Sequence, residues 1–438
     1  MTRPRFAAIA LTLLAAAAVW IGARASEKPK TRVLVVGIDA GEWDVLGPLI
    51  DSGKCPNFAR MRAQGSAGKL RSLLPLTRSP VIWTSIATGK VPEKHGVLDF
   101  FSRNPGRDPE TGDPAPEGRG RPPQTSNTWK ARPVWQILSG LGRTVGVIGW
   151  WCTWPAEPTN GVIVTDYVEY SGRSEWPAVG SRRTYPDSLF ALVERLRVKP
   201  ENVSWAEIFQ FVPPFDTTKA VVRQETLTQS LRTVYAADLT FHRVGLALYR
   251  RNHADFFGQY YRGVDEMCHL YWDADVINSH LDDPLNKEER AWLRSIIPNY
   301  YIFTDRLLGE FLREADKNTD VIVCSDHGFG GGGEGVRAHK PDGIIFMTGP
   351  HVVKGTITGA NVLDITPTIL AMLGLPTARD MDGRPIATGL KPALVKRMER
   401  ETRLQTYETA RTGQSEEPLR SPVDQELRER LRSLGYIQ

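Results

Sequence analysis

The stretch VIVCSDHGFGGGGEGVRAHKPDGIIFMTGP, residues 321–350, contains two short apolar runs separated by polar residues and glycines. The first run, Val321–Cys324, is typical of a strand that is buried on both faces. Asp326 and His327 follow it directly, and His339 lies beyond the glycines. Functional groups in open α/β sheets cluster beyond the carboxyl ends of the strands. The stretch therefore predicts a buried sheet with a functional site at its strand ends.

Similar apolar runs recur along the chain between segments with helical patterns, at Val33–Ile38, Val145–Ile148, Val162–Thr165, Phe256–Tyr261 and Ile344–Met347. This alternation predicts an α/β fold. Asp39 directly follows the first of these runs. We therefore expect its carboxylate at the same sheet edge as Asp326.

Composition limits the classes of protein that fit. The chain has 438 residues, 41% hydrophobic and 24% charged, which is enough for one large domain with insertions or for two domains. Its net charge is +5, without a block of Lys and Arg interleaved with aromatic residues, which argues against a nucleic acid polymer as partner.

The four cysteines, at 55, 152, 268 and 324, include no C-x-x-C pair. A dense disulfide framework is therefore excluded, while one or two bridges remain open. Cys324 lies in an apolar run and is predicted to be a buried small hydrophobe.

The N-terminus predicts export. Arg3 and Arg5 precede an apolar run, Phe6–Gly22, and the Ala-Arg-Ala at 23–25 fits a signal-peptide cleavage site. The run is also close to the length that spans a bilayer, so residues 1–25 are predicted to be a signal peptide or a membrane anchor. Either places the rest of the chain in the periplasm, outside the cell, or anchored outside the cytoplasm.

We predict one large domain over residues 26–390, with a helical insertion at about 185–250. Residues 391–438 form a charged tail. Its end, VDQELRERLRSLGYIQ, predicts a short amphipathic helix with Leu427, Leu431 and Leu434 on one side.

Asp265 and His269 form a D-x-x-x-H pair, whose spacing on a helix brings both side chains to one face. Together with Asp39, Asp326, His327 and His339, the chain offers three carboxylates and three imidazoles on segments that follow strands. Taken singly, each of these residues also fits a structural role such as helix capping. The set of six predicts a metal site, best suited to Zn²⁺, with Mn²⁺ or Fe as alternatives.

The segment SPVIWTSIATG, residues 79–89, predicts a short helix over Val81–Thr88. Pro80 fits the first helical position, which makes Ser79 the N-cap. A hydroxyl at a helix N-terminus is well placed to attack a bound phosphate, although Ser79 also fits a capping role alone. Thr77 is the nearest rival as nucleophile.

Six segments, VLVVGIDAGEWD, SPVIWTSIATGKVPEKHGV, GVDEMCH, VCSDHGFG, AHKPDGIIFMTGP and DITPTILAMLGLPTARDMDGRPI, occur in this order over about residues 32–390. In this order they resemble the type I phosphodiesterase/nucleotide pyrophosphatase family of the alkaline phosphatase superfamily. The resemblance implies a three-layer α/β/α sandwich with a mostly parallel central sheet and a helical insertion.

The resemblance also implies two divalent metal ions, usually zinc, and a phosphate-ester substrate hydrolysed through a phosphoserine at Ser79. By position, the ligands of one ion would be Asp265, His269 and His339, and those of the other Asp39, Asp326 and His327. The Ser79 oxygen would bind between or beside the ions.

Three departures from related patterns narrow the function. After His95-Gly96, residues 97–101 lack the Asn that nucleotide pyrophosphatases carry, which weakens the expectation of a nucleotide substrate. No C-x-P-x-R or S-x-P-x-R motif stands at the nucleophile, which argues against a sulfatase. The segment GFGGGGEG lacks the Lys-Ser/Thr of a P-loop and predicts a mobile loop.

Two further functions stay open. One is a phosphotransferase that moves a phospho-headgroup onto a membrane lipid or glycan, and the other is a metal-bearing binding protein without catalysis. The tryptophans Trp150, Trp151 and Trp154 either pack against the sheet or line a substrate cleft, and packing is the stronger prediction.

Overall fold

The computed structural model describes residues 31–75, 78–103, 121–170, 181–218, 222–273, 283–332, 336–409 and 417–436. The predicted signal peptide or anchor, residues 1–25, and the rival nucleophile Thr77 lie outside the described residues. Across the described ranges, we find no helix with the length and apolar character needed to cross a membrane.

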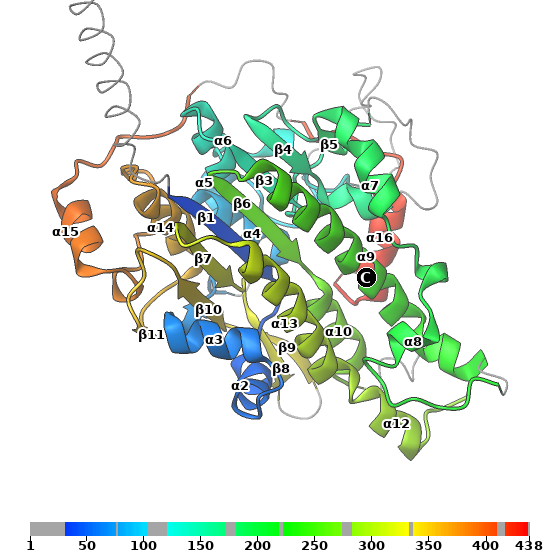
Figure 1. Cartoon of the computed structure of the whole chain (residues 1–438). Coiled ribbons are helices and arrows are strands. Elements are labelled where there is room, and N and C mark those ends of the chain that lie inside the picture. The colour runs from blue at the N-terminus through cyan, green and yellow to red at the C-terminus, as the bar shows by residue number, and fades with distance from the viewer. Residues whose placement is uncertain are drawn as a thin grey trace, which may run out of the picture.

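Within the described residues, nine strands form one sheet in the order β11-β2-β10-β7-β1-β6-β3-β4-β5 (Figure 1). Their bounds are β1 (Arg32–Ile38), β2 (Ser66–Arg71), β3 (Val145–Ile148), β4 (Gly161–Val164), β5 (Thr184–Tyr185), β6 (Phe256–Tyr261), β7 (Thr319–Cys324), β10 (Asp342–Thr348) and β11 (Gly355–Ile357). The central strand β1 pairs in parallel with β6 and β7, and β3 pairs in parallel with β6 and β4. The carboxyl ends of these strands therefore meet at one edge of the sheet.

Helices cover both faces of the sheet (Figure 1). One layer contains α2 (Trp43–Asp51), α3 (Pro56–Gln64), α9 (Val222–Asn252), α10 (Gly263–Tyr271) and α13 (Ile296–Glu314). The other contains α4 (Ser79–Thr88), α6 (Val134–Gly140), α14 (Ile365–Met372) and α15 (Pro392–Arg400). The remaining helices are α5 (Pro92–His95), α7 (Phe190–Leu196), α8 (Trp205–Ile208), α12 (Lys287–Leu293) and α16 (Asp424–Ser433).

The residues of β1 show why the sheet is buried on both sides. Leu34 and Val36 belong to the hydrophobic cluster of the first helical layer, and Val33 and Val35 to that of the second. Successive side chains of a strand point to opposite faces, so a continuous apolar strand requires helices on both. The predicted three-layer α/β/α sandwich with a mostly parallel sheet is confirmed.

All six predicted apolar runs are strands, with small shifts at their ends. The helices α7, α8 and α9 lie between β5 and β6, in the region predicted to be helical. At the other end of the chain, α16 forms where the amphipathic helix was predicted, and Leu427, Leu431 and Leu434 are buried. The four cysteines are buried and free of disulfide bonds, and Cys324 packs in the core as predicted.

The predicted glycine loop is wrong in part, because Gly328–Gly332 form strand β8, which pairs antiparallel with β9 (Val336–Lys340). Glycines are weak strand formers when judged by propensity alone. Here they permit close packing: a Cβ on Gly328 would lie 2.5 Å from the Asp342 carbonyl oxygen. Tertiary packing thus selects a hairpin where local sequence indicates a loop.

Helix α4 also starts earlier than predicted. Its first residue is Ser79, and Arg78 holds the N-cap position without a side-chain capping hydrogen bond, so the prediction of Ser79 as N-cap is wrong by one residue. The predicted end is correct, because Gly89 adopts a left-handed φ of 69°. Ser79 therefore does not cap the helix with its own side chain.

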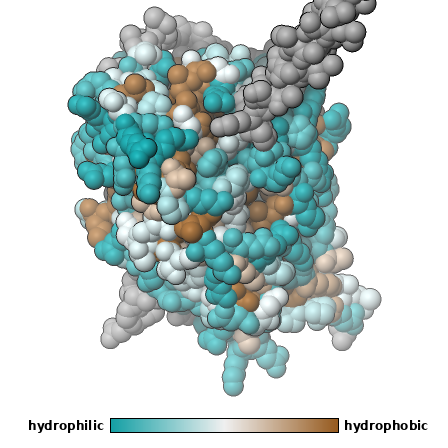
Figure 2. All heavy atoms as spheres, turned by 60° about the vertical axis from the view of Figure 1, so that its left-hand side comes forward, coloured by the Kyte–Doolittle hydropathy of each residue, from teal (hydrophilic) through white to brown (hydrophobic). Residues whose placement is uncertain are grey.

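The molecular face in Figure 2 is mostly hydrophilic, with apolar residues in separate small areas. Among the described residues, the exposed large apolar side chains include Leu74 and Leu98, which lie in the chain segments on either side of α4 and α5. Single exposed apolar residues are ordinary on protein surfaces.

Candidate active site

Asp39 and Asp326 come together where β1 and β7 end. The backbone N–H of Ala40 donates to Asp326 Oδ1 at 3.3 Å, and that of Gly41 donates to Ser325 Oγ at 2.7 Å. Ala40 has a φ of 55°, a left-handed conformation that is strained for a residue with a Cβ. These bonds hold the two strand ends together and place both carboxylates at the same edge.

Asp265 and His269 reach this edge from α10, which begins directly after β6. Asp238 on α9 fixes the start of α10 by accepting hydrogen bonds from the Gly263 N–H at 3.1 Å and the Tyr300 hydroxyl at 2.9 Å. Asp265 and His269 are one helical turn apart, and His269 Nε2 lies 3.5 Å from Asp265 Oδ1. The predicted D-x-x-x-H geometry is therefore present.

The β8–β9 hairpin brings in His339, which pairs with Phe329 across the two strands. The His339 ring stacks on that of His327, with centroids 3.9 Å apart. Its Nε2 lies 3.0 Å from His269 Nε2 and 3.7 Å from Asp265 Oδ1. The fold thus assembles all six predicted ligands from four separate chain segments.

The bonding of His327 determines what its second nitrogen can do. Its Nδ1 lies 3.0 Å from the Gly328 carbonyl oxygen, which can only accept, so Nδ1 carries the proton. In the neutral ring, Nε2 then presents a lone pair to Asp326 Oδ2 at 3.3 Å and Asp39 Oδ1 at 3.5 Å. A lone pair and carboxylate oxygens at these distances can share a proton or ligate one metal ion.

Burial and like charge shift the titration of these groups. Burial, reinforced by the charge of Asp39, raises the pKa of the Asp265 and Asp326 carboxyls well above their usual range. Burial also lowers the pKa of the His327 and His339 imidazoles, so both are neutral near pH 7. Holding the carboxyl groups of this cluster in their ionised form is therefore costly without a compensating cation.

The residues fit metal ions. Asp265 Oδ1, Asp326 Oδ2 and His327 Nε2 are buried and have no hydrogen-bond partner among the described residues. Ligand atoms of Asp265, His269 and His339 lie within 4.8 Å of one another, and so do those of Asp39, Asp265 and His327. Asp326 adjoins the second group through His327, and Asp265 lies between the two groups.

Ser79 lies beside the second group. Its side chain is buried, and its hydroxyl donates to Asp39 Oδ1 over a long 3.4 Å contact. The other oxygen of Asp39 accepts from the Trp83 indole N–H at 3.3 Å and from the Tyr260 hydroxyl. The Asp39 carboxylate is thereby fixed with one oxygen toward Ser79 and His327.

Sequence reasoning missed the residues that orient Asp39. Trp83 lies within the α4 segment and Tyr260 within a strand run, so their spacing marks them only as core. Trp150 and Trp154 are buried as predicted, whereas Trp151 is partly exposed and donates to the Tyr260 hydroxyl at 2.6 Å. Trp151 also lines the small cavity that contains Asp39 and Asp265. The tryptophan stretch therefore serves both packing and the site.

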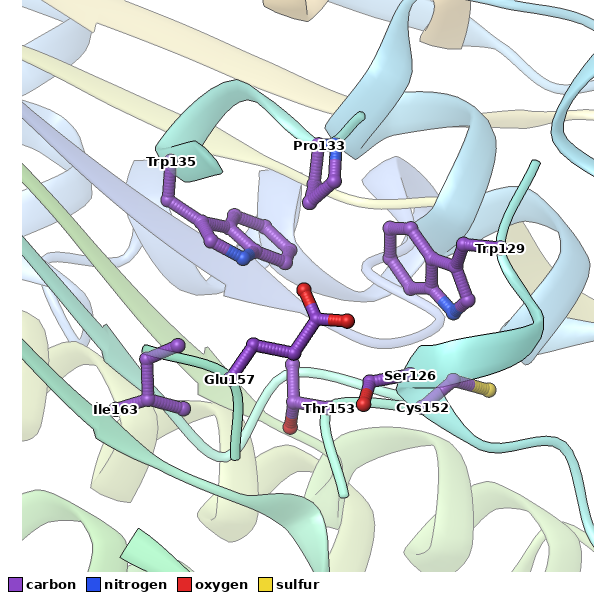
Figure 3. A pocket seen from close by; sticks show the side chains of 8 residues that line it. All are labelled: Ser126, Trp129, Pro133, Trp135, Cys152, Thr153, Glu157 and Ile163. Carbon is purple, nitrogen blue, oxygen red and sulfur yellow. The ribbon is translucent and has the colours of Figure 1, made fainter. Parts of the chain in front are cut away.

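A second small cavity, of ≈10 Å³, lies apart from these groups. Figure 3 shows the Glu157 carboxylate between Trp129 and Trp135, with Pro133 close by. Trp135 packs on Trp150, and this aromatic layer separates the cavity from the Asp39 carboxylate. The volume is enough for about one water molecule.

Comparison with solved structures supports the fold. The chain superimposes on the 2-O GAG sulfatase BT1596 with a TM-score of 0.51 and 12% identity, over 85% of this chain and 76% of that chain. Murine ectonucleotide pyrophosphatase/phosphodiesterase 5 gives a lower TM-score of 0.41 at 13% identity, over 78% of this chain and 95% of that chain. Sinorhizobium meliloti phosphonoacetate hydrolase gives a TM-score of 0.38 at 17% identity, over 69% of this chain and 57% of that chain. The first of these likenesses shows the fold alone.

The sequence as a whole has no match among curated proteins. A family profile nevertheless matches residues 33–367, from the first strand to within α14. This range includes all six predicted ligands and Ser79, and covers most of the chain. The protein therefore belongs to the type I phosphodiesterase/nucleotide pyrophosphatase family, whose members are metal-dependent hydrolases of phosphate esters.

Proposed function

We propose that the protein is an exported phosphodiesterase that cleaves phosphate esters through a phosphoserine at Ser79, with two divalent metal ions, best satisfied by zinc. One observation carries the proposal: the Ser79 hydroxyl is buried and bonded to Asp39, beside the buried atoms Asp265 Oδ1, Asp326 Oδ2 and His327 Nε2, which have no hydrogen-bond partner among the described residues. A serine hydroxyl beside candidate metal ligands is the arrangement of a nucleophile that metal ions can activate.

The chain's own groups account for the two steps of an in-line displacement. Asp39 Oδ1 accepts the hydrogen bond of Ser79 and orients Oγ toward the phosphorus. The bond from Ser79 Oγ to phosphorus forms as the bond to the leaving alcohol breaks, and the alcohol departs with the proton that Ser79 releases. Water then cleaves the phosphoserine and restores the hydroxyl.

The six ligands would hold the metal ions in two sets, Asp265, His269 and His339 in one and Asp39, Asp326 and His327 in the other. When bound, the ions lower the pKa of the attacking hydroxyl and neutralise charge on the phosphoryl oxygens. Mn²⁺ and Fe suit the same mixture of nitrogen and oxygen ligands.

The test is to compare Ser79→Ala with Thr77→Ala, using bis-p-nitrophenyl phosphate as substrate. Ser79→Ala should lower turnover by several orders of magnitude and abolish the phosphopeptide that contains Ser79, as detected by mass spectrometry. Its metal content should be largely retained, because the protein ligands remain. Thr77→Ala should behave like the wild type. An inactive Thr77→Ala variant or an active Ser79→Ala variant would show that Ser79 is not the nucleophile. Turnover of an aryl sulfate at the same rate as bis-p-nitrophenyl phosphate would contradict a phosphodiester as the substrate class.

Export rests on the basic residues and apolar run in residues 1–25. Cells that produce the full chain should contain it outside the cytoplasm, and N-terminal sequencing should start at Ser26 if the segment is cleaved. Intact chain in the cytoplasmic fraction would contradict both a signal peptide and an anchor.

A further inference from the structure

The end of the chain lies against the candidate active site. One small cavity is lined both by Leu431, Leu434 and Tyr436 of this segment and by Asp39 and Asp265. The cavity measures only ≈10 Å³, which is room for about one water molecule. The C-terminal segment therefore fills the space next to the metal ligands on this side. In Figure 1 it can be followed as the red helix α16.

Tyr436 makes the closest contacts. Its hydroxyl donates to Asp265 Oδ2, the carboxylate oxygen that does not face the imidazoles. Its ring centroid lies 4.4 Å from that of His269 and 5.1 Å from that of Phe100. The phenol ring thus packs against the imidazole of His269, a predicted ligand, at a tilt of 51°.

Apolar packing holds α16 in this position. Val423, Leu427 and Leu431 belong to one buried cluster with residues of three distant segments, namely Phe100, Phe101, Trp154 and Tyr167. Burial of these apolar side chains stabilises the docked helix. The helix is therefore part of the folded domain.

Ion pairs add a second attachment. Arg430 lies 2.5 Å from Glu266 on α10 and 3.3 Å from Glu169. Both glutamate side chains are only 4–6% exposed. The Arg430–Glu266 pair ties α16 to α10, the helix that carries Asp265 and His269. Glu266 also pairs with Arg262 at 3.1 Å. Buried pairs of this kind favour one arrangement over alternatives.

The turn after α16 directs Tyr436 back toward the site. Gly435 has a φ of 78°, which favours glycine, and the Tyr436 N–H donates to the Leu431 carbonyl at 2.9 Å. This closes the helix end and fixes the direction of the Tyr436 side chain. A segment held by apolar packing, ion pairs and a closed turn is a fixed wall, which distinguishes it from a lid that opens.

We propose that α16 and Tyr436 form a fixed wall of the substrate site and limit the size of the ester group that lies beside His269. The inference rests on the proposed phosphodiesterase function and narrows its substrate class to phosphodiesters whose group on this side is small. Tyr436 acts through its ring, as a specificity-determining residue that contacts the substrate's ester group.

The test compares methyl p-nitrophenyl phosphate with bis-p-nitrophenyl phosphate on zinc-loaded protein. Tyr436→Ala should raise the relative turnover of the larger ester roughly tenfold or more, the scale on which pocket size discriminates. Tyr436→Leu, which keeps an apolar anchor for the turn, should give a smaller rise. Tyr436→Phe, which keeps the ring and removes only the hydroxyl bonded to Asp265, should keep the wild-type ratio of the two turnover rates. Ser433→Ala, on the exposed side of α16, is the control variant. An unchanged ratio in both Tyr436→Ala and Tyr436→Leu overturns the wall, and an equal rise in Tyr436→Phe overturns the role of the ring.

A second measurement does not depend on turnover. In metal-free protein, diethyl pyrocarbonate should modify His269 several times faster in Tyr436→Ala than in the wild type or Ser433→Ala, as followed by peptide mass mapping. Equal rates would show that the ring does not cover His269. Lack of phosphodiesterase turnover in every variant would contradict the proposed function, whereas the labelling rates test the wall separately.

Discussion

A single buried carboxylate, Asp305, and the cluster of carboxylates at the strand ends differ in how their oxygens are hydrogen-bonded. Asp305 on α13 accepts hydrogen bonds from the backbone N–H groups of Asn57 and Phe58 at 3.0 and 2.9 Å, and from the Asn57 amide at 2.8 Å. It thereby joins α13 to the first turn of α3. In the cluster at the strand ends, Asp265 Oδ1 and Asp326 Oδ2 have no such partner among the described residues.

The comparison distinguishes a buried carboxylate that stabilises the fold from buried carboxylates that mark a functional site. Burial raises the pKa of Asp305, and the hydrogen bonds from Phe58 and Asn57 oppose that shift. For Asp326 the neighbouring charge of Asp39 adds to burial, and a single bond from Ala40 opposes it. A buried carboxylate with amide donors stabilises a fold, whereas carboxylates that crowd one another without donors indicate a cation site.

The largest expected effect comes from removing one carboxylate of each kind. Asp326→Ala should lower zinc affinity by more than the ~10–100-fold that loss of an outer-shell partner costs, and phosphodiesterase turnover should fall with it. Asp305→Ala should leave zinc binding unchanged and lower the free energy of unfolding by about 1–3 kcal/mol, because two backbone N–H groups lose their acceptor. Zinc titration and thermal unfolding of both variants measure these effects. Similar zinc affinity in the two variants would contradict the distinction between Asp326 as a zinc ligand and Asp305 as a structural carboxylate.

A smaller effect should appear in the pH dependence of stability. Because the pKa values of Asp265 and Asp326 are raised in the folded metal-free chain, that state keeps protons that the unfolded chain releases above about pH 4. These groups therefore lower the stability of the metal-free protein as pH rises above that value. Zinc requires the deprotonated ligands, so its stabilising effect should grow from about pH 5 to about pH 8.

At a free zinc concentration 100-fold above Kd, the stabilisation should reach about 2.7 kcal/mol. Thermal unfolding with and without zinc at each pH measures it. Asp305→Ala should keep this zinc increment and Asp326→Ala should lose most of it. A zinc increment that does not change with pH would argue that the ligands are already deprotonated in the metal-free protein.

Much of the fold and the site was predictable from local sequence. The apolar runs around β1, β6 and β7 are continuous because both faces are covered, and that pattern is visible in sequence. Asp39 and Asp326 follow those runs, and Asp265 and His269 share a helical spacing. The structure brings these four side chains together with His327, His339 and Ser79, while their catalytic roles stay predictions.

The remaining features of the fold and the site depend on contacts between segments that are distant in sequence, and local patterns do not predict them. The β8–β9 hairpin forms because glycines allow close approach to Asp342 and Lys340, although local propensity favours a loop. The position of Tyr436 follows from the docking of α16 on Phe100 and Glu266, which no spacing rule encodes. Amphipathic character predicted that α16 would pack on something, but not on what.

The most direct test of the account is the metal content of purified protein by elemental analysis. We expect about two zinc ions per wild-type chain after zinc loading, and about one in His339→Ala, because only the set with Asp265 and His269 loses a ligand. Asp305→Ala should keep the wild-type content. A wild-type content that stays near one ion after zinc or manganese addition, or the loss of both ions in His339→Ala, would contradict the two-metal site.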